Sequence, residues 1–327
     1  MTRLQRIGTR GGRAPPVALG SVDDMITAEG LTKRFGDKTA VQDVSFTVQP
    51  GTVTGFLGPN GAGKSTTMRL IVGLDRPTSG TATVAGREYR KLRAPLTEVG
   101  VLLDAKAVHT GRSARDHLRA MAATHGIPAS RVDEVIDLAG IAPVSRKRAG
   151  KFSLGMGQRL GIASALLGDP HTLILDEPVN GLDPEGVRWV RQFVRHAASE
   201  GRTVLLSSHL MSEMAQTADH VIVMGRGKVL ADAPLEELVR AWTTNTVRVR
   251  TPRATDLAAA VGGPSVEIVS AAPDVLDIVG LPAARIGDLA AERGIPLHEL
   301  TPTTGSLEDA YLALTGESVE YRTKEIS

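Results

Sequence analysis

Apolar and polar positions alternate along residues 25–50, and the alternation breaks at Gly36 and Asp37. A period of two is typical of half-buried strands, so this stretch predicts an antiparallel hairpin. The short apolar run at 53–57 predicts a buried strand. The segment at 66–72 has the periodicity of a helix, so a strand is expected to lead through a short loop into a helix.

Capping residues indicate further helices downstream. Ser113 is placed to cap a helix that ends near His125. Asp183 and Pro184 suit the N-cap and first position of a helix that ends near Ser199. Periodicity and terminating glycines predict other helices, with a basic, irregular stretch between them; in chain order these segments are 131–139, 143–151 and 157–168.

Apolar strands at 172–175 and 203–206 alternate with these helices. Such alternation predicts an α/β fold with a mostly parallel sheet that is covered on both faces. We therefore expect a main domain over 25–242. An antiparallel β subdomain begins it, and a helical subdomain occupies about 105–168.

The composition changes after about residue 242. A strand is expected at 247–250, and the segments expected to follow are a helix at 253–261, a strand at 265–269 and a helix at 284–293. They predict a small α/β accessory domain over 243–327, which carries no chemical motif. Residues 1–24 lack an apolar centre, so we expect a disordered leader, or an extension upstream of a native start at Met25, rather than a secretory signal.

Composition narrows the classes of function. Of 327 residues, 42% are hydrophobic and 23% are charged, which is typical of a globular chain with a full core. A net charge of +2 and an aromatic content of 3% give no basis for a nucleic-acid surface. The absence of cysteine excludes disulfides and cysteine nucleophiles. No apolar run approaches the roughly 18–20 residues of a membrane span, so action at a membrane would require a partner.

A phosphate-binding motif follows the strand at 53–57. Nine consecutive residues have the form found in nucleoside triphosphatases, namely Gly58, Pro59, Asn60, Gly61, Ala62, Gly63, Lys64, Ser65 and Thr66. The glycines let backbone N–H groups wrap phosphates, Lys64 can reach the β- and γ-phosphates, and the Ser65 hydroxyl can hold Mg²⁺. A chance Gly-rich turn is the alternative, and the flanking strand and helix argue against it.

Polar residues also end two predicted strands. Asp176 and Glu177 follow the strand at 172–175, at the strand tip where α/β sheets bind ligands. Asp176 is placed to hold the Mg²⁺ shell, and Glu177 to act as a general base toward water. An ordinary strand with an acidic loop is the alternative. His209 follows the strand at 203–206 on the same sheet edge, which favours a γ-phosphate contact over a purely structural histidine.

The chain resembles the nucleotide-binding subunit of ABC transporters over about residues 25–240, and its motifs occur in the order found in that family. The resemblance implies ATP as cofactor with Mg²⁺, and it identifies the loop and the acidic pair as the Walker A and Walker B motifs. It further implies that Phe35 stacks on adenine and that His209 is the switch histidine. A D-loop is implied at 180–183, with Asp183 at the nucleotide.

The chain departs from the family pattern at two places. The signature L-S-G-G-Q corresponds to residues 152–156, where only Ser153 and Gly155 match. A serine hydroxyl and backbone N–H groups at a helix N-terminus can still contact phosphate. Asp104 replaces the Q-loop glutamine, and its carboxylate could ligate Mg²⁺ directly or through water. These departures and the tail at 306–316 resemble bacterial drug- and bacitracin-type export ATPases.

The resemblance implies a site that one chain does not complete. Ser153 would face the ATP of a second copy, so two copies would hold two ATP molecules head to tail. Lys64, Mg²⁺ and His209 would stabilise charge, and Glu177 would orient water. The implied partner is a separately encoded integral membrane permease, docked on about 104–121 unless that segment is a plain solvated subdomain. The protein would then be peripheral, on the cytoplasmic side of the plasma membrane.

Three classes of function stay open at this stage. The first is the energy-supplying subunit of an exporter. The second is a soluble ABC-type ATPase that acts on ribosomes or nucleic acid, although such proteins usually carry two ATPase units or a long coiled-coil insert. The third is a regulatory or binding module with weak turnover. The altered signature and Asp104 keep this class open, and the Asp176 and Glu177 pair argues against it. No motif identifies the transported substrate.

Overall fold

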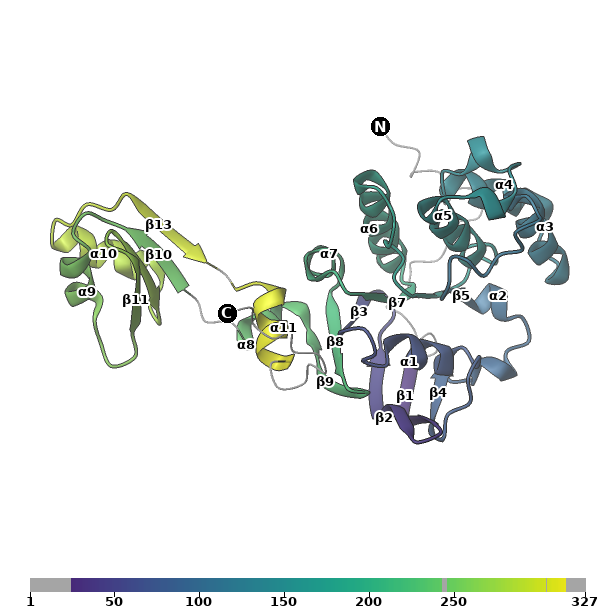
Figure 1. Ribbon diagram of the computed structural model, residues 1–327, viewed down its shortest axis with the longest axis horizontal. Helices are drawn as coiled ribbons and strands as arrows, with labels where there is room; N and C mark the ends of the chain where they lie inside the picture. Colours follow the sequence, from purple (N-terminus) through teal and green to yellow (C-terminus); the bar gives the residue numbers. More distant parts are fainter. Residues whose placement is uncertain (1–24, 243–245, 304, 316–327) are drawn as a thin grey trace. The chain divides into compact units, whose positions relative to one another are not determined.

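The computed structural model describes residues 25–242, 246–303 and 305–315 (Figure 1). The chain divides into two compact units. Met1–Thr54 and Lys64–Ser207 form the first unit, and Gly55–Gly63 and Ser208–Ser327 form the second. Strand β3 (Val53–Leu57) therefore begins in the first unit and ends in the second. The predicted leader at 1–24 lies outside the described residues.

An antiparallel sheet with the order β2-β1-β4 begins the first unit. Strand β1 (Ile26–Phe35) pairs with β2 (Lys38–Val48) and with β4 (Ser79–Val84). The predicted hairpin is confirmed, because Phe35 pairs with Lys38 across the turn. Buried residues alternate over Ile26 and Ala28 of β1 and over Val44, Phe46 and Val48 of β2, which is why the sequence pattern has a period of two there.

The central sheet runs in the order β5-β6-β7-β3-β8-β9. Strands β5 (Val99–Leu102), β6 (Thr172–Leu175) and β7 (Thr203–Ser208) pair in parallel. Strands β8 (His220–Gly225) and β9 (Lys228–Pro234) pair antiparallel. The expected α/β fold with a mostly parallel sheet is confirmed. All residues of β6 and β7 are buried, as expected for strands that are covered on both faces.

The first unit contains several helices. Described in chain order, they are α1 (Lys64–Ile71), α2 (Pro95–Glu98), α3 (Ala114–Thr124), α4 (Ala129–Leu138), α5 (Leu154–Ala165) and α6 (Pro184–Ser199). Ser113 caps α3 and Asp183 caps α6, as predicted. Helix α5 begins at Leu154, before the expected Gly157, because Ser153 accepts a hydrogen bond from the Met156 N–H and serves as its N-cap. The irregular stretch at 143–151 contains short 3₁₀ turns.

The second unit adds α7 (Met211–Thr217) and α8 (Leu235–Trp242) to β8 and β9, and then a sheet of its own. We call residues 246–303 the accessory fold. Its elements are β10 (Thr246–Arg250), α9 (Ala254–Val261), β11 (Glu267–Ala272), β12 (Val275–Val279), α10 (Ala283–Glu292) and β13 (Glu299–Thr303). The expected strand at 265–269 lies slightly later, as β11, and β12 and β13 were not predicted.

The accessory fold has a ferredoxin-like arrangement. Its strand order is β11-β12-β10-β13, every pair is antiparallel, and the chain connects β-α-β-β-α-β. Val247, Val249 and Ile278 from the strands pack with Leu257 of α9 and Ile286 of α10 in a separate apolar core. These residues are at most 3% exposed, so the fold buries its own hydrophobic surface.

The last described helix, α11 (Leu307–Thr315), packs against α8 and α7 (Figure 1). Its Leu307 and Ala310 are buried. Ser306 and Asp309 form a reciprocal cap, in which each backbone N–H donates to the other side chain at 3.0–3.1 Å. The chain therefore returns to α7 and α8 after it has built the accessory fold. None of the described helices has the length and apolar character of a membrane span.

Candidate functional site

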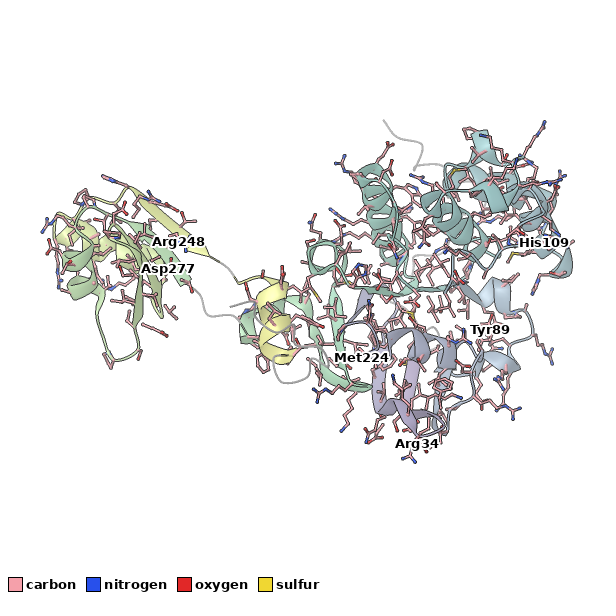
Figure 2. All side chains as sticks on the ribbon, viewed as in Figure 1. Arg34, Tyr89, His109, Met224, Arg248 and Asp277 are labelled. Atoms are coloured by element: carbon pink, nitrogen blue, oxygen red, sulfur yellow. The ribbon has the colours of Figure 1, made fainter. Side chains whose placement is uncertain are left out.

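The phosphate-loop sequence folds as a glycine-dependent turn in the second unit. Gly58, Gly61 and Gly63 have φ angles of +155°, +84° and +104°. Only glycine adopts such angles without strain. A Cβ atom on Gly58 would lie 2.5 Å from the carbonyl oxygen of Met224. Met224 lies on β8 and is labelled in Figure 2. Both the backbone angle and the close approach of β8 therefore require a glycine at this position.

Main-chain hydrogen bonds hold the same loop. The Ala62 N–H donates to the Pro59 carbonyl at 3.1 Å, and the Gly227 N–H donates to the Ala62 carbonyl at 3.0 Å. Gly227 lies in the turn between β8 and β9, so that hairpin supports the loop. Asn60 and Gly61 are exposed at its tip. Glycines with positive φ can turn consecutive backbone N–H groups toward one point, where these groups bind an anion.

Lys64 begins α1 and lies in the first unit. Lys64 is only 6% exposed. Burial lowers the pKa of its ammonium from the usual 10.5, and the carboxylates of Glu177 and Asp176 act in the opposite direction. The buried ammonium at a helix N-terminus is suited to bind a phosphate group, and the two nearby carboxylates are suited to bind the Mg²⁺ that accompanies it.

The acidic pair is fixed by the neighbouring strand ends. Asp176 follows β6 directly, and its N–H donates to the Leu102 carbonyl of β5 at 2.7 Å. The Ser207 hydroxyl, at the end of β7, donates to the Asp176 carboxylate. It also accepts a hydrogen bond from the Glu177 N–H at 2.9 Å. Ser207 is fully buried, so this bridge is shielded from water.

Glu177 has an unusual backbone conformation. Its φ angle is +50°, which is uncommon for a residue with a side chain. Its carbonyl accepts hydrogen bonds from the Gln158 side-chain amide and from the Asn180 N–H, both at 3.1 Å. Sequence reasoning assigned no role to Ser207 or Gln158. The available signal for Ser207 was a hydroxyl at the end of the strand next to the acidic pair.

The predicted magnesium ligands are of the type that Mg²⁺ prefers. Ser65 is an exposed residue in the first turn of α1, and Asp176 presents a carboxylate at the strand tip. The described residues contain no cluster of three or more His, Asp or Glu side chains that could hold a metal. This fits Mg²⁺, which is usually bound by one or two protein groups with phosphate and water as the other ligands. Asp104 is exposed, and its carboxylate accepts the Lys106 N–H at 2.8 Å.

The signature segment packs against the D-loop of the same chain. Ser153 is exposed at the N-terminus of α5. A Cβ atom on Gly155 would lie 2.8 Å from the Gly181 carbonyl oxygen, and the Leu154 side chain fills the space beside Gly181. Gly155 is therefore required by packing within the chain. The Asp183 carboxylate accepts the Gly186 N–H at 2.9 Å as the N-cap of α6.

Comparison with known proteins identifies the family. A family model described as ABC transporter matches residues 41–180. A Bacillus subtilis protein, the uncharacterized ABC transporter ATP-binding protein YhcH, is 34% identical over 307 residues, which cover 90% of this chain and 97% of that protein. This chain belongs to the ABC transporter ATP-binding proteins. It is an ATP-hydrolysing subunit of that family.

Other relatives of this ABC protein are named for antibiotics. The bacitracin transport ATP-binding protein BcrA of Bacillus licheniformis is 41% identical over 65% of this chain and 71% of that protein. The daunorubicin resistance ATP-binding protein DrrA3 of Streptomyces coeruleorubidus is 33% identical over 93% of this chain and 99% of that protein. A domain of unknown function matches residues 245–308.

Solved structures support the same fold. An ATP-binding subunit of an ABC transporter has a TM-score of 0.61 at 24% identity and covers 66% of this chain and 92% of its own. A dimeric ATP-binding cassette bound to ADP and Pi, in a post-hydrolysis state, has a TM-score of 0.59 at 20% identity and covers 64% of this chain and 98% of its own. At these identities the likeness concerns the fold alone.

The remaining predicted residues of the ABC protein lie on separate elements. Phe35 ends β1 and is 50% exposed, with the Lys33 ammonium 4.8 Å from its ring centre. His209 is exposed in the second unit, directly after β7 and before α7. Thr66 is half-buried in α1. An exposed aromatic ring at a strand end is suited to stacking on a planar ligand.

Proposed function

We propose that this ABC protein powers a separately encoded membrane permease, which exports a drug, an antibiotic or a lipid-like compound. The observation that carries the proposal is the similarity to a daunorubicin resistance protein over 93% of this chain and 99% of that relative. The match includes the accessory fold as well as the nucleotide-binding motifs. The bacitracin transport relative supports the same class of substrate.

The contiguous run Gly58–Thr66 is proposed to bind the phosphates of ATP. Its glycines turn backbone N–H groups toward an anion, and the buried Lys64 ammonium adds a positive charge. Ser65 and Asp176 would hold Mg²⁺, with Asp104 as a third oxygen donor. When bound, the metal offsets the negative charge of the β- and γ-phosphates. Phe35 is proposed to stack on the adenine ring.

Glu177 is proposed to orient the attacking water, and His209 to contact the γ-phosphate. The fixed backbone of Glu177 supports this role, because catalysis of phosphoryl transfer depends on positioning and on electrostatic stabilisation. Lys64 would stabilise the charge that develops on the transferred phosphoryl group.

A second copy of the chain is proposed to complete each site. Ser153 and Gly155 lie at the N-terminus of α5, where unpaired backbone N–H groups favour an anion. They would contact the ATP held by the other copy, together with Asp183 of the D-loop. The dimeric cassettes among the solved structures are consistent with such an arrangement.

The permease is proposed to dock on residues 104–121, with the protein peripheral at the cytoplasmic side of the membrane. Residues 145–151 lie beside this segment, because Ala149 and Gly150 N–H groups donate to the carbonyls of Arg112 and Thr110 at 2.9 and 3.1 Å. Exposed cations gather on the two segments, and these are Lys106, Arg112, Arg119, Arg146, Lys147, Arg148 and Lys151. An acidic permease surface would complement them.

The proposal is tested by capture of the partner. A tagged Glu177→Gln variant is expected to bind ATP without hydrolysing it and so to persist as a dimer with its permease attached. Purified with ATP from detergent-solubilised native membranes, it should bring down a polytopic membrane protein in fixed ratio. Lys64→Ala is the matched control, since it should neither hold ATP nor form the dimer. Recovery of ribosomes or nucleic acid, without a membrane protein, would refute the transporter role.

A further inference from the structure

We infer that Ser207 and Gln158 are positioning residues for ATP hydrolysis, because together they hold the backbone of Glu177 in its left-handed conformation. The inference rests on the proposed role of Glu177 in orienting water. Neither residue belongs to the nucleotide-binding motifs, and both lie in the first unit with the acidic pair.

The hydrogen-bond directions at Ser207 are determined by its partners. The Glu177 N–H can only donate, so the Ser207 oxygen accepts that bond, at 2.9 Å. The single hydroxyl proton is then directed to the Asp176 carboxylate. One fully buried hydroxyl therefore fixes the side chain of Asp176 and the main chain of Glu177 at once.

The left-handed conformation has a consequence for the two carboxylates. In an extended strand, consecutive side chains point to opposite faces of the sheet. Asp176 and Glu177 directly follow β6, which ends at Leu175. The φ angle of +50° at Glu177 breaks the strand alternation at this point. Without its hydrogen bonds, this unfavourable conformation would relax and move the Glu177 carboxylate.

Gln158 holds the next peptide group, on the other side of the Glu177 Cα. It is 5% exposed on α5, and its Nε2 donates to the Glu177 carbonyl at 3.1 Å. Its Oε1 is buried and has no hydrogen-bond partner among the described residues. If the amide were rotated by 180°, Oε1 would lie against the Glu177 carbonyl oxygen and the hydrogen bond would be lost. The bond to Glu177 therefore requires the orientation in which Oε1 stays unpaired. Burial of an unpaired amide oxygen is unfavourable, which argues that Gln158 is retained for the contact with Glu177.

The contact also joins two motifs. Helix α5 begins at the signature residue Ser153, and Gln158 lies little more than one turn further along it. A movement of α5 would therefore move the main chain of Glu177 through this hydrogen bond. In this arrangement, engagement of Ser153 by a second copy adjusts the residue that orients water.

The test separates positioning from ATP binding and from folding. The full-length Ser207→Ala and Gln158→Leu variants are expected to lose about ten- to hundredfold in kcat, a range typical of residues that orient a catalytic group. Gln158→Leu should keep the affinity for ATP, because the Gln158 amide bonds to the Glu177 carbonyl, and both variants should remain folded at the assay temperature, which their melting temperatures check. Ser207→Thr, which keeps the hydroxyl, should retain most of the turnover. Ser164→Ala is the matched control, because its hydroxyl bonds to Leu160 within α5.

The double variant adds a second readout. Since both bonds restrain the backbone of one residue, Glu177, losing the second should cost less than the first, so the two effects should not multiply. Ser207→Cys, of similar volume, serves if the alanine variant does not fold. Wild-type turnover in both Ser207→Ala and Gln158→Leu, or a loss confined to ATP affinity in both, would overturn the inference alone. Full turnover by Glu177→Gln would overturn the proposed role of Glu177 and the inference with it.

Discussion

Glycines in the same loop of this ABC protein are required for different reasons. Gly58 and Gly61 belong to the same loop and both have positive φ angles. A Cβ atom would meet the Met224 carbonyl oxygen at 2.5 Å on Gly58, but would meet nothing within 4 Å on Gly61. The two positions therefore separate backbone strain from steric conflict.

We expect Gly58→Ala to destabilise the protein by about 1–3 kcal/mol more than Gly61→Ala does, because a backbone oxygen cannot move aside as a flexible side chain would. Gly61→Ala should cost roughly 1–2 kcal/mol, since it meets only the conformational penalty. The free energies of unfolding from urea denaturation compare the two variants. An equal loss at both positions would show that the contact with Met224 has no energetic weight.

Lys64→Ala is expected to lower ATP turnover by at least about 10²–10³-fold, since it removes a charge aimed at the transferred phosphate. ATP should raise the melting temperature of the wild-type protein and leave that of the variant unchanged, because only a bound ligand stabilises the folded state. Calorimetry with and without ATP measures this. A variant that ATP still stabilises would contradict the assigned role.

Residue types and spacing were enough to find the loop, the acidic pair and both predicted caps. They could not reveal the left-handed backbone of Glu177. That conformation depends on bonds from Ser207 and Gln158, which are 30 and 19 positions away in the chain. Local sequence carries no record of such distant partners, and a glutamate would ordinarily be expected to avoid a positive φ.

At the scale of elements, helix starts were predicted best where the cap is a local feature. Asp183 and Pro184 start α6 as expected. The start of α5 was placed too late, because the glycines at 155 and 157 weaken the helical pattern over its first turn. Strands β12 and β13 went unpredicted, since their partners are distant in the chain and short strands carry a weak signal.

Asp183 has two candidate duties, which substitutions can separate. We expect Asp183→Ala to lower the free energy of unfolding by about 0.5–2 kcal/mol through loss of the α6 cap. Asp183→Asn should keep the cap, since an amide oxygen can accept the Gly186 N–H, while it removes the negative charge. A drop in ATP turnover by Asp183→Asn at unchanged stability would support a D-loop role. Unchanged turnover would leave capping as its function.

At the scale of the whole molecule, the accessory fold has its own core and its own charge pairs. Arg248 on β10 donates two hydrogen bonds of 2.8 Å to Asp277 on the neighbouring β12 (Figure 2). These bonds, and then the positive charge of Arg248, lower the pKa of Asp277. The pair therefore stabilises the fold at a pH above the unfolded-state pKa of about 3.9, and the contribution is lost as the pH falls through the lower folded value.

We accordingly expect Asp277→Asn to be less stable than the wild type at neutral pH, with the difference vanishing in acid. Asp274→Asn is the control, because Asp274 lies 3.8 Å from Arg250 and makes a looser pair. Unfolding followed from pH 7 down to about pH 2 tests the sign. A difference that grows toward low pH would be opposite to the expected linkage.

The return of the chain as α11 makes the accessory fold an insertion rather than a tail. Leu238 of α8 is 3% exposed, and α11 packs on α7 and α8 after the excursion through 246–303. A nonsense mutation anywhere in that excursion would remove α11 along with the rest. The phenotype of such a truncation would combine the loss of the accessory fold with the loss of α11. An in-frame internal deletion that rejoins α8 to α11 would show what the accessory fold itself contributes. The same topology means that a gene shortened from its 3′ end would lose α11 before it lost the accessory fold.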